Sequence, residues 1–440
     1  MLWRIQLPTL DFTTVFLFIA IFSASIAAVL TFTFHNLGPV SGRCPFVLLP
    51  ASMPTIHYLT TAEAVTTAAA HFATLPRIGI DLEFDDMRHR YGRHLALIQI
   101  FDGLEAYLID PLPLPIMAAD LEPLFAVLRD PAVAKVFHSC KSDILLLDEV
   151  FSVNCRNIVD TSVQFTLLAA EDNNISLGRL IQAELGFEVD KGEQKSNWLK
   201  RPLTESQKEY AANDVFYLFE LTDRLSARLE ELGRADWAAQ ENLALEAVRY
   251  GRDDPRPWSR NAAKYKISAQ EMPIFRELYM LRDTVARQLD RPPYHVLSND
   301  RLAELARNPL ETALQLRGAN GLHPELKRSP YAEQLLAIGT TDLEPDAPLP
   351  PEHRKFPFRR RLGGPAAARA DAREALLMAL KGHLATDHGS TIANMVLSNR
   401  LIADIIELGT KAALRPWQQQ LLKGSAEKHG ADYASIEEPF

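Results

Sequence analysis

The sequence predicts an α/β domain followed by two all-helical modules, and three observations support this fold class. From Met53 to about Gly233, strand patterns alternate with helical patterns, which is typical of a sheet covered by helices. Beyond Gly233 the strand patterns end and helical periodicity dominates. In this helical part, Val296–Leu302 (VLSNDRL) recurs as Val396–Leu401 (VLSNRL), and such a repeat indicates two related modules.

The composition is that of a globular protein. The 440 residues are 47% hydrophobic and 23% charged, and the length suggests roughly two to four domains. The formal net charge of -9 argues against general binding of polyanions, so any nucleic-acid contact requires local basic patches. Cys44, Cys140 and Cys155 are too few and too unevenly spaced for a disulfide framework or a zinc site. We therefore expect a reducing, cytoplasmic location.

Residues 12–34 form an uncharged apolar stretch long enough to cross a bilayer. Arg4 is the single basic residue before this stretch and Asp11 intervenes, so the flanks are poor for a secretory signal. Met53 opens a stretch typical of the first strand of a soluble domain, which favours a start assigned too far upstream for residues 1–52. A membrane anchor and a cleaved signal are the alternatives, so membrane attachment requires that residues 12–34 are real and retained.

The first buried strand of the α/β domain, Arg77–Phe84 (RIGIDLEF), carries two acids. Its apolar residues alternate with the other positions, which is the period of a strand. Asp81 and Glu83 are two residues apart, so their carboxylates project from the same face. Two close carboxylates repel each other unless a cation lies between them, and their oxygens suit Mg²⁺ or Mn²⁺. An acid pair that ends an edge strand in water is the alternative.

The other elements of this domain follow from periodicity and turn signals. Helices are expected at residues 60–74, 121–129 and 144–150. Strands are expected at residues 94–101, 105–109 and 135–137.

The best-marked helix begins after Thr204 and is expected to run through Tyr210 and Asp214 to about Leu232, with Gly233 placed to end it. Thr204 and Gln207 have the spacing of a capping box. Tyr210 and Asp214 are four residues apart, so they lie on one face of this helix.

The two helical modules each contain a helical run followed by the repeated motif, in which Ser or Asn would cap the next helix. A Pro-rich connector joins the modules and ends in a basic cluster that includes Arg359, Arg360 and Arg361. This cluster is a candidate phosphate contact, and a solvated linker is the alternative.

Four acids and one tyrosine lie on the expected strands and helices of this domain: Asp81 and Glu83 on a strand, Asp143 at the start of a helix, and Tyr210 and Asp214 inside a helix. Four carboxylates and a phenol can hold two divalent ions about 3.5 to 4 Å apart, which activate a water for attack on a phosphodiester and stabilise the leaving 3′ oxygen. Tyr210 would aim that water. For each acid alone a surface carboxylate is the alternative, and we assign five further acids to it: Asp85, Asp86, Asp148, Asp160 and Asp172.

These segments resemble the signatures of the ribonuclease D family, in the tyrosine-bearing branch of the DEDD superfamily of 3′→5′ exonucleases. The signatures are Asp-x-Glu, His-x-x-x-x-Asp and Tyr-x-x-x-Asp, here at Asp81 to Glu83, His138 to Asp143 and Tyr210 to Asp214. The run from Lys195 to Thr204 resembles the family's approach to the third signature, although Asn197 stands where Asp is expected. The repeated helical modules resemble HRDC domains, which bind nucleic acid.

The resemblance implies a ribonuclease H-like mixed-sheet exonuclease domain followed by two HRDC-type modules. It implies the release of 5′-mononucleotides from the 3′ end of RNA, especially precursor tRNA. The sequence itself gives no sign of an obligate protein partner. Asp81, Glu83, Asp143 and Asp214 would bind two divalent metal ions, with Asp143 acting partly through coordinated water, and Tyr210 would position the attacking water.

RNA contacts are predicted at His138 and at the basic cluster Arg359, Arg360 and Arg361, through stacking and backbone contacts. Phe84 and Phe101 are candidates for the same surface, but their strand alternation favours core positions.

The expected organisation has seven segments: an N-terminal extension (1–52), the exonuclease domain (53–235), a helical connector (236–264), the first HRDC-like domain (265–337), a Pro-rich and basic linker (338–367), the second HRDC-like domain (368–428) and a tail (429–440). Two other functions stay open at this point. A DNA 3′→5′ exonuclease could use the same acids, whereas a non-catalytic RNA-binding protein would have no use for them.

Overall fold

The computed structural model describes residues 54–112, 118–168, 175–190, 192–251, 257–343 and 364–437. The apolar stretch 12–34 and the basic cluster Arg359–Arg361 lie outside these residues. Within the described ranges, none of the helices combines the length and the apolar character needed to traverse a bilayer.

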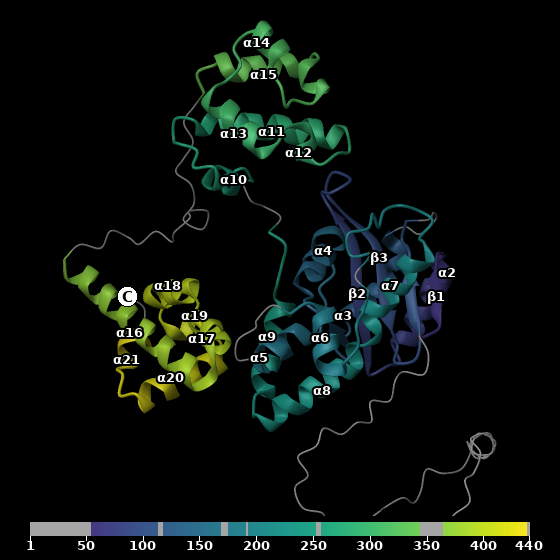
Figure 1. The fold of residues 1–440 in the computed structure, drawn as a ribbon, viewed down its shortest axis with the longest axis vertical. Coiled ribbons are helices and arrows are strands. Elements are labelled where there is room, and N and C mark those ends of the chain that lie inside the picture. Colours follow the sequence, from purple (N-terminus) through teal and green to yellow (C-terminus); the bar gives the residue numbers. More distant parts are fainter. Residues whose placement is uncertain are drawn as a thin grey trace, which may run out of the picture. The chain divides into compact units, whose positions relative to one another are not determined.

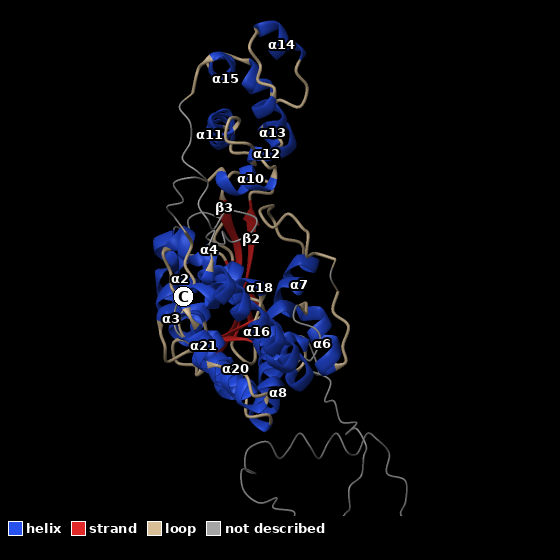
Figure 2. Cartoon of the chain, turned by 90° about the vertical axis from the view of Figure 1, so that its left-hand side faces the viewer, coloured by secondary structure: helices blue, strands red, loops and turns tan. Residues whose placement is uncertain are grey.

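The α/β domain is built on a mixed sheet (Figures 1 and 2). Its strands are β1 (Ile56–Leu59), β2 (Arg77–Asp86), β3 (Arg93–Phe101), β4 (Ala106–Ile109), β5 (Ala134–Phe137) and β6 (Ile158–Asp160). Their order across the sheet is β1-β4-β3-β2-β5-β6. β3 pairs antiparallel with β2 and β4, and the other neighbours pair in parallel. The strand with the acid pair, β2, is therefore an inner strand, and the edge-strand alternative is wrong.

The two faces of β2 and β3 have different neighbours because side chains alternate along each strand. One face joins the main hydrophobic core with α2 (Ala62–Phe72), α3 (Glu122–Arg129) and α4 (Lys141–Phe151). Its buried residues include Ile78, Ile80, Ile98 and Ile100. The other face lies under α7 (Glu205–Phe216), where Leu97 packs with Ala211 and Phe101 packs with Val215. The predicted core position of Phe101 is confirmed, and Phe84 packs partly buried against the main core.

The helix expected to run from Thr204 to Gly233 is two helices, so this prediction is wrong in part. α7 ends at Phe216 and α8 (Leu218–Glu231) begins after Tyr217. The two helices have different partners, because α7 covers the sheet whereas α8 packs on α5 (Thr161–Leu168) and α6 (Leu177–Leu185). Tyr217 keeps helical angles, with φ -87° and ψ -5°, so the break has no Gly or Pro to mark it in the sequence. The capping box of Thr204 and Gln207 is confirmed.

The first helical module is built from short helices around one core that includes Phe275, Leu302 and Leu335. Its elements are α10 (Ser259–Lys264), α11 (Met272–Gln288), α12 (Pro293–Val296), α13 (Asn299–Arg307), α14 (Ala313–Gly318), the 3₁₀ turn η2 (Pro324–Lys327) and α15 (Tyr331–Thr340).

The second helical module contains α16 (Pro365–His388), α17 (Ser390–Val396), α18 (Asn399–Leu408), α19 (Thr410–Ala413), α20 (Pro416–Lys428) and α21 (Ala434–Glu437). The repeated motif has the same role in both modules, because the hydroxyls of Ser298 and Ser398 cap α13 and α18. Trp417 of α20 stacks on Trp237 of α9 (Ala235–Glu246), with ring centroids 4.7 Å apart.

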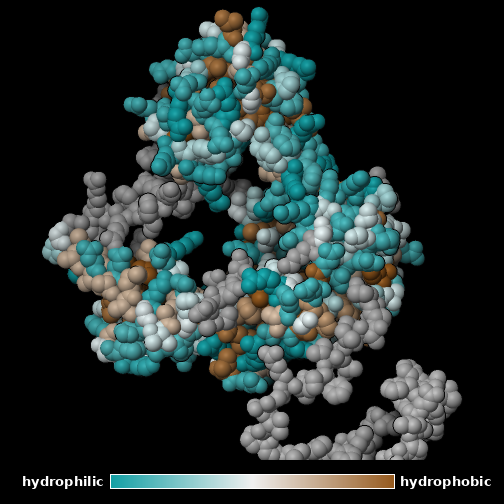
Figure 3. All heavy atoms as spheres, viewed as in Figure 1, coloured by the Kyte–Doolittle hydropathy of each residue, from teal (hydrophilic) through white to brown (hydrophobic). Residues whose placement is uncertain are grey.

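The described surface is mostly hydrophilic on the face shown in Figure 3, and its hydrophobic side chains occur in separate patches. The largest exposed apolar fractions belong to Leu104 and Leu314, which lie far apart in the sequence. Scattered exposure of this kind is normal for a folded protein.

The α/β domain also contains a 3₁₀ turn, η1 (Ala118–Leu121), which leads into α3.

Removing the cap of α7 should destabilise the protein measurably. The Thr204 hydroxyl accepts the Gln207 N–H at 3.1 Å, so Thr204→Ala leaves that donor without its partner and costs about 1 kcal/mol. We expect the melting temperature of the α/β domain to fall by about 2–4 °C in scanning calorimetry. Thr61→Ala is the matched control, because Thr61 caps α2 by accepting the Ala64 N–H at 3.3 Å. A fall for Thr61→Ala without one for Thr204→Ala would contradict the role of the capping box.

Candidate active site

β2 and α7 bring three of the predicted acids together. One carboxylate oxygen each from Asp81, Glu83 and Asp214 lies within 4.8 Å of the others. Asp81 and Glu83 project from the face of β2 that α7 covers, and Asp214 is in the last turn of α7. The pairing of β2 with β3 shifts between Glu83 and Phe84, so a β-bulge follows the acid pair. Bulges of this kind re-aim side chains next to functional sites.

Asp143 lies beside this cluster, in the first turn of α4. β5 pairs with β2 only from Arg77 to Gly79, and the chain then leaves the sheet before α4 begins. The negative charge of Asp143 contributes to the raised pKa of Glu83, and the charge of Asp81 acts in turn on Asp143. Asp143 is therefore electrostatically part of the site, although its oxygens are outside the group that lies within 4.8 Å.

The acids of the site hold protons more tightly than ordinary carboxyl groups. Burial raises the pKa of Asp81 to about 7. Burial, together with the charges of Asp81, Asp214 and Asp143, raises the pKa of Glu83 to about 10. Burial and the charge of Asp81 also raise the pKa values of Asp143 and Asp214 well above their usual range. A cluster of carboxylate oxygens that resists ionising alone is the donor set that a hard divalent cation fits, because the cation's charge replaces the protons.

Tyr210 lies one helical turn before Asp214, and the two side chains are close enough for each to act on the pKa of the other. Burial first, and then the charges of Asp214 and Glu83, raise the pKa of Tyr210 far above its usual value. The phenol therefore stays protonated and can donate a hydrogen bond. The indole of Trp198 lies against it, with ring centroids 6.0 Å apart, so the tyrosine ring is held in place.

His138 has both ring nitrogens in use within the fold. Nδ1 lies 2.9 Å from the Thr161 hydroxyl and Nε2 lies 3.0 Å from the Ile175 carbonyl oxygen. Burial lowers the pKa of His138, which favours the neutral ring. An RNA contact at His138 stays a prediction, and it would have to use the face of the ring.

Three of the five acids interpreted as surface carboxylates are buried, so that interpretation is wrong for Asp85, Asp148 and Asp160. Each of the three accepts at least one backbone N–H: Asp160 from Ser139 and Cys140, Asp148 from Tyr250, and Asp85 from the hairpin described below. A turn or chain crossing leaves N–H groups without partners, and a buried carboxylate satisfies them. The remaining two acids differ: Asp86 is exposed and pairs with Arg93, whereas Asp172 lies outside the described residues.

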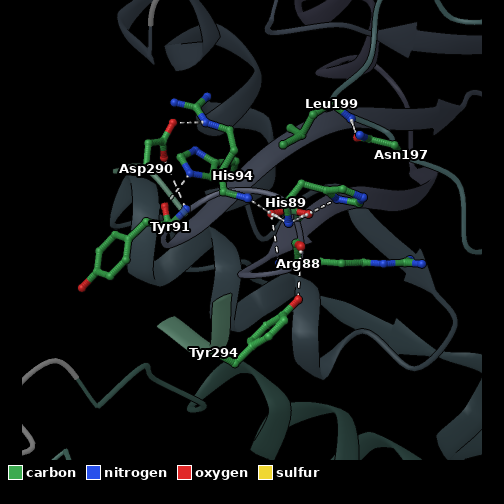
Figure 4. A network of polar contacts seen from close by, with 10 residues as sticks. Arg88, His89, Tyr91, His94, Asn197, Leu199, Asp290 and Tyr294 are labelled. Carbon is green, nitrogen blue, oxygen red and sulfur yellow. Dashed lines mark hydrogen bonds and ion pairs between the residues drawn. The ribbon is translucent and has the colours of Figure 1, made fainter. Parts of the chain in front are cut away.

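Asp85 accepts hydrogen bonds within the hairpin between β2 and β3, whose residues Arg88, His89 and Tyr91 are labelled in Figure 4. Its carboxylate accepts the backbone N–H groups of Arg88, His89 and Arg90, and it lies 2.6 Å from the His89 ring. The hydroxyl of Tyr294, a residue of α12, donates to the carbonyl of Arg88 in this hairpin. Sequence analysis missed this feature, although the basic run RHRYGRH after the acidic strand was a visible signal.

Comparison with known proteins identifies an exonuclease region and an HRDC region in this chain. Residues 56–230 match a family model described as a 3′-5′ exonuclease, and residues 271–338 match the HRDC domain. A ribonuclease D from Xanthomonas oryzae pv. oryzae is 33% identical over 377 residues, which cover 83% of this chain and 96% of that relative. A ribonuclease D from Jannaschia sp. is 32% identical over 296 residues, with 64% and 72% covered.

Solved structures support the likeness across both the sheet domain and the helical part. The crystal structure of Escherichia coli RNase D has a TM-score of 0.63 and 25% identity, and covers 85% of this chain and 99% of its own. A protein from Bifidobacterium adolescentis shares the fold, with a TM-score of 0.68, 19% identity, and 87% and 99% covered. Since the identity to the Xanthomonas relative spans nearly its entire length, the chain belongs to the ribonuclease D family.

Proposed function

We propose that this protein is a metal-dependent 3′→5′ exoribonuclease that releases 5′-mononucleotides by hydrolysis. The observation that carries this proposal is the cluster of Asp81, Glu83 and Asp214, in a chain of the ribonuclease D family. The family favours RNA over DNA as the substrate. A non-catalytic RNA-binding protein is disfavoured, because buried acids that repel one another would only destabilise a protein that binds polyanions.

In this proposal Asp81, Glu83, Asp143 and Asp214 hold two divalent cations, Mg²⁺ or Mn²⁺. The bound cations would supply Lewis acidity, which activates water and stabilises the oxygen that leaves. Asp143 would contribute partly through coordinated water, which agrees with its place beside the three closer carboxylates. Tyr210 would donate its hydrogen bond to orient the attacking water, and Trp198 would keep the phenol in place.

We further propose that the substrate is the 3′ end of a precursor tRNA. The E. coli RNase D is described as an exoribonuclease involved in structured RNA processing, which supports a folded RNA with an accessible 3′ tail. The helical modules would bind that RNA, with the second module, residues 368–428, acting as a second HRDC-like domain. The matching caps at Ser298 and Ser398 support this assignment.

The function is tested with purified full-length protein and three end-labelled substrates: a 3′-extended tRNA, an unstructured RNA and a DNA of the same sequence. Products are resolved by length, with EDTA, and with Mg²⁺ or Mn²⁺ added back. We expect stepwise shortening of RNA from the 3′ end that stops in EDTA and resumes with either metal. Faster shortening of the DNA would overturn the RNA assignment, and no shortening of any substrate would overturn the nuclease.

Asp81→Asn should lower the rate of nucleotide release by about 10²–10³-fold or more, because a charged group in a water-excluded site is lost. Its melting temperature without metal should not fall, since the mutation removes a buried charge from a repelling cluster. Asp86→Asn is the matched control on the same strand, where the exposed side chain pairs with Arg93. Equal rates for Asp81→Asn and the parent would exclude Asp81 as a metal ligand.

Tyr210→Phe should lower kcat by roughly 10²-fold, because the attacking water loses the hydroxyl that orients it. The Kd for RNA should change little. The ring and its contact with Trp198 remain, so the loss would belong to the hydroxyl alone. Tyr217→Phe, at the junction of α7 and α8, is the control and should leave kcat unchanged. A parallel loss of kcat and RNA affinity in Tyr210→Phe would contradict a role in positioning water.

The pH dependence of stability should reveal the protonated acids. Because the pKa of Asp81 is raised to about 7, the folded protein binds more protons than the unfolded chain between about pH 4 and pH 7. The stability of the metal-free protein should therefore fall as the pH rises through this range, and Glu83 should extend the fall above pH 7. Stabilisation by Mg²⁺ should grow with pH, because the cation competes with protons.

Thermal unfolding at pH 5.5, 6.5 and 8.0, in EDTA and in Mg²⁺, measures both effects. Asp81→Asn should flatten the pH dependence in EDTA. A metal-free protein that becomes more stable from pH 5.5 to 8.0 would show that the site acids are not the groups that retain protons.

A further inference from the structure

Gln99 is a buried amide that the fold leaves without partners. It lies in the middle of β3, and its exposed fraction is 0%. Neither its Oε1 nor its Nε2 has a hydrogen-bond partner among the described residues. An unsatisfied buried polar group destabilises a protein, so the presence of an amide at this position requires a physical reason.

The pairing of β2 with β3 places Gln99 directly opposite Asp81. Residues opposite each other in an antiparallel pair project to the same face, with Cβ atoms about 4.5–5.5 Å apart. The neighbours of Gln99 along this face of β3 are Leu97 and Phe101, and both pack against α7. Gln99 is thus the polar residue between two apolar residues on this face of β3, and it lies opposite Asp81.

The layer between the sheet and α7 is thin at this point. A Cβ atom added to Gly79 would lie 3.3 Å from the Val215 carbonyl oxygen and 3.4 Å from the Phe101 Cβ. The backbone of α7 therefore approaches β2 closely, next to the position of Asp81. Since Gln99 is completely buried in this layer, its amide cannot reach an RNA chain at the surface. Any effect of Gln99 on the reaction has to pass through a neighbouring side chain.

We infer that Gln99 is a positioning residue of the metal site: its Nε2 donates to the Asp81 carboxylate when that carboxylate binds a divalent cation. This inference rests on the proposed metal site. Carboxylates that bind metals are themselves held by hydrogen bonds from a second layer of residues, and loss of such a partner typically weakens metal affinity 10–100-fold. The amide would hold the oxygen that does not bind the cation, and so fix the direction of the one that does.

Gln164 shows what a satisfied buried glutamine looks like in the same domain. It is 3% exposed, its Nε2 donates to the Ser226 hydroxyl at 2.8 Å, and its Oε1 accepts from the Thr222 hydroxyl at 2.9 Å. These contacts tie α5 to α8 and involve none of the site acids. Gln164 is therefore a matched control for burial and amide chemistry.

The test compares Gln99→Met with Gln164→Met in the full-length protein. Methionine keeps the length of the side chain and removes the amide. In metal-free buffer, Gln99→Met should melt at the same temperature as the parent or higher, because an unsatisfied amide is removed. Calorimetric titration with Mn²⁺ should show an affinity lower by roughly 10–100-fold. Gln164→Met should do the opposite, with a lower melting temperature and unchanged Mn²⁺ affinity.

The double variant Asp81→Asn/Gln99→Met tests whether Gln99 acts through Asp81. In the Asp81→Asn background, Gln99→Met should cause no further loss of Mn²⁺ affinity, and two additive losses would overturn the inference. Unchanged Mn²⁺ affinity in Gln99→Met alone, or a lower melting temperature without metal, would overturn it as well.

A second substitution, Gln99→Leu, keeps the test decisive if Gln99→Met does not fold. Failure of both to fold would make Gln99 a structural residue and end the proposal. Mn²⁺ binding to the unmutated protein distinguishes a failure of the proposed metal site from a failure of the inference about Gln99. If Mn²⁺ binding to the parent does not depend on Asp81, the proposed metal site itself fails; if it does and Gln99→Met binds normally, only the inference about Gln99 fails.

Discussion

The structure depends on holding several carboxyl groups together in a place where they repel one another. Asp81 and Glu83 project from an inner strand toward α7, and Asp214 projects from α7 toward them. Desolvation and like charge both oppose ionisation there, as the raised pKa values of Asp81 and Glu83 indicate. Apolar packing on either side, such as Leu97 with Ala211 and Phe101 with Val215, holds the two elements together despite this repulsion. The site is thus organised by the surrounding core and is complete electrostatically only with cations.

Side chains alternate along β2 and β3, so one face of this strand pair forms the core and the other carries the site acids. One face supplies the main core through Ile78, Ile80, Ile98 and Ile100, and it is this burial that fixes the register. A slip of one residue would turn the acids into that core and the isoleucines toward α7. Since a buried carboxylate without a partner is far more costly than a buried isoleucine, the apolar face determines where the acids lie.

Local patterns in the sequence predicted much of this arrangement, and the family resemblance predicted that acids from distant segments meet. Other contacts between distant segments were not predictable. The expected strands, the capping box at Thr204 and the serine caps of the modules follow from neighbouring residues, and the structure confirms them. The short strand β6 was not predicted. The break at Tyr217 does not, because it arises from the different partners of α7 and α8. The place of Gln99 opposite Asp81 depends on the strand register, which the sequence of either strand alone does not contain. The roles of the site residues remain proposals, supported by their convergence.

The acids of this domain fall into two kinds, and hydrogen bonding to the backbone distinguishes them: Asp85 and Asp160 are buried and satisfied, whereas Asp81 and Glu83 are partly buried. Asp85 and Asp160 accept several backbone N–H groups and thereby shape the hairpin after β2 and the turn that leads to α4. Burial acts to raise the pKa of Asp85, yet the hydrogen bonds from His89 and Arg90 hold it below its usual value. Asp81 and Glu83 lack such a set of donors, and their pKa values are raised. An acid that the fold satisfies is structural, and an acid that the fold leaves in need of positive charge points to a ligand that supplies it. This criterion supports the proposed metal site at Asp81 and Glu83. Asp85 and Asp160 explain why the segments that carry Glu83 and Asp143 hold their shape beside it.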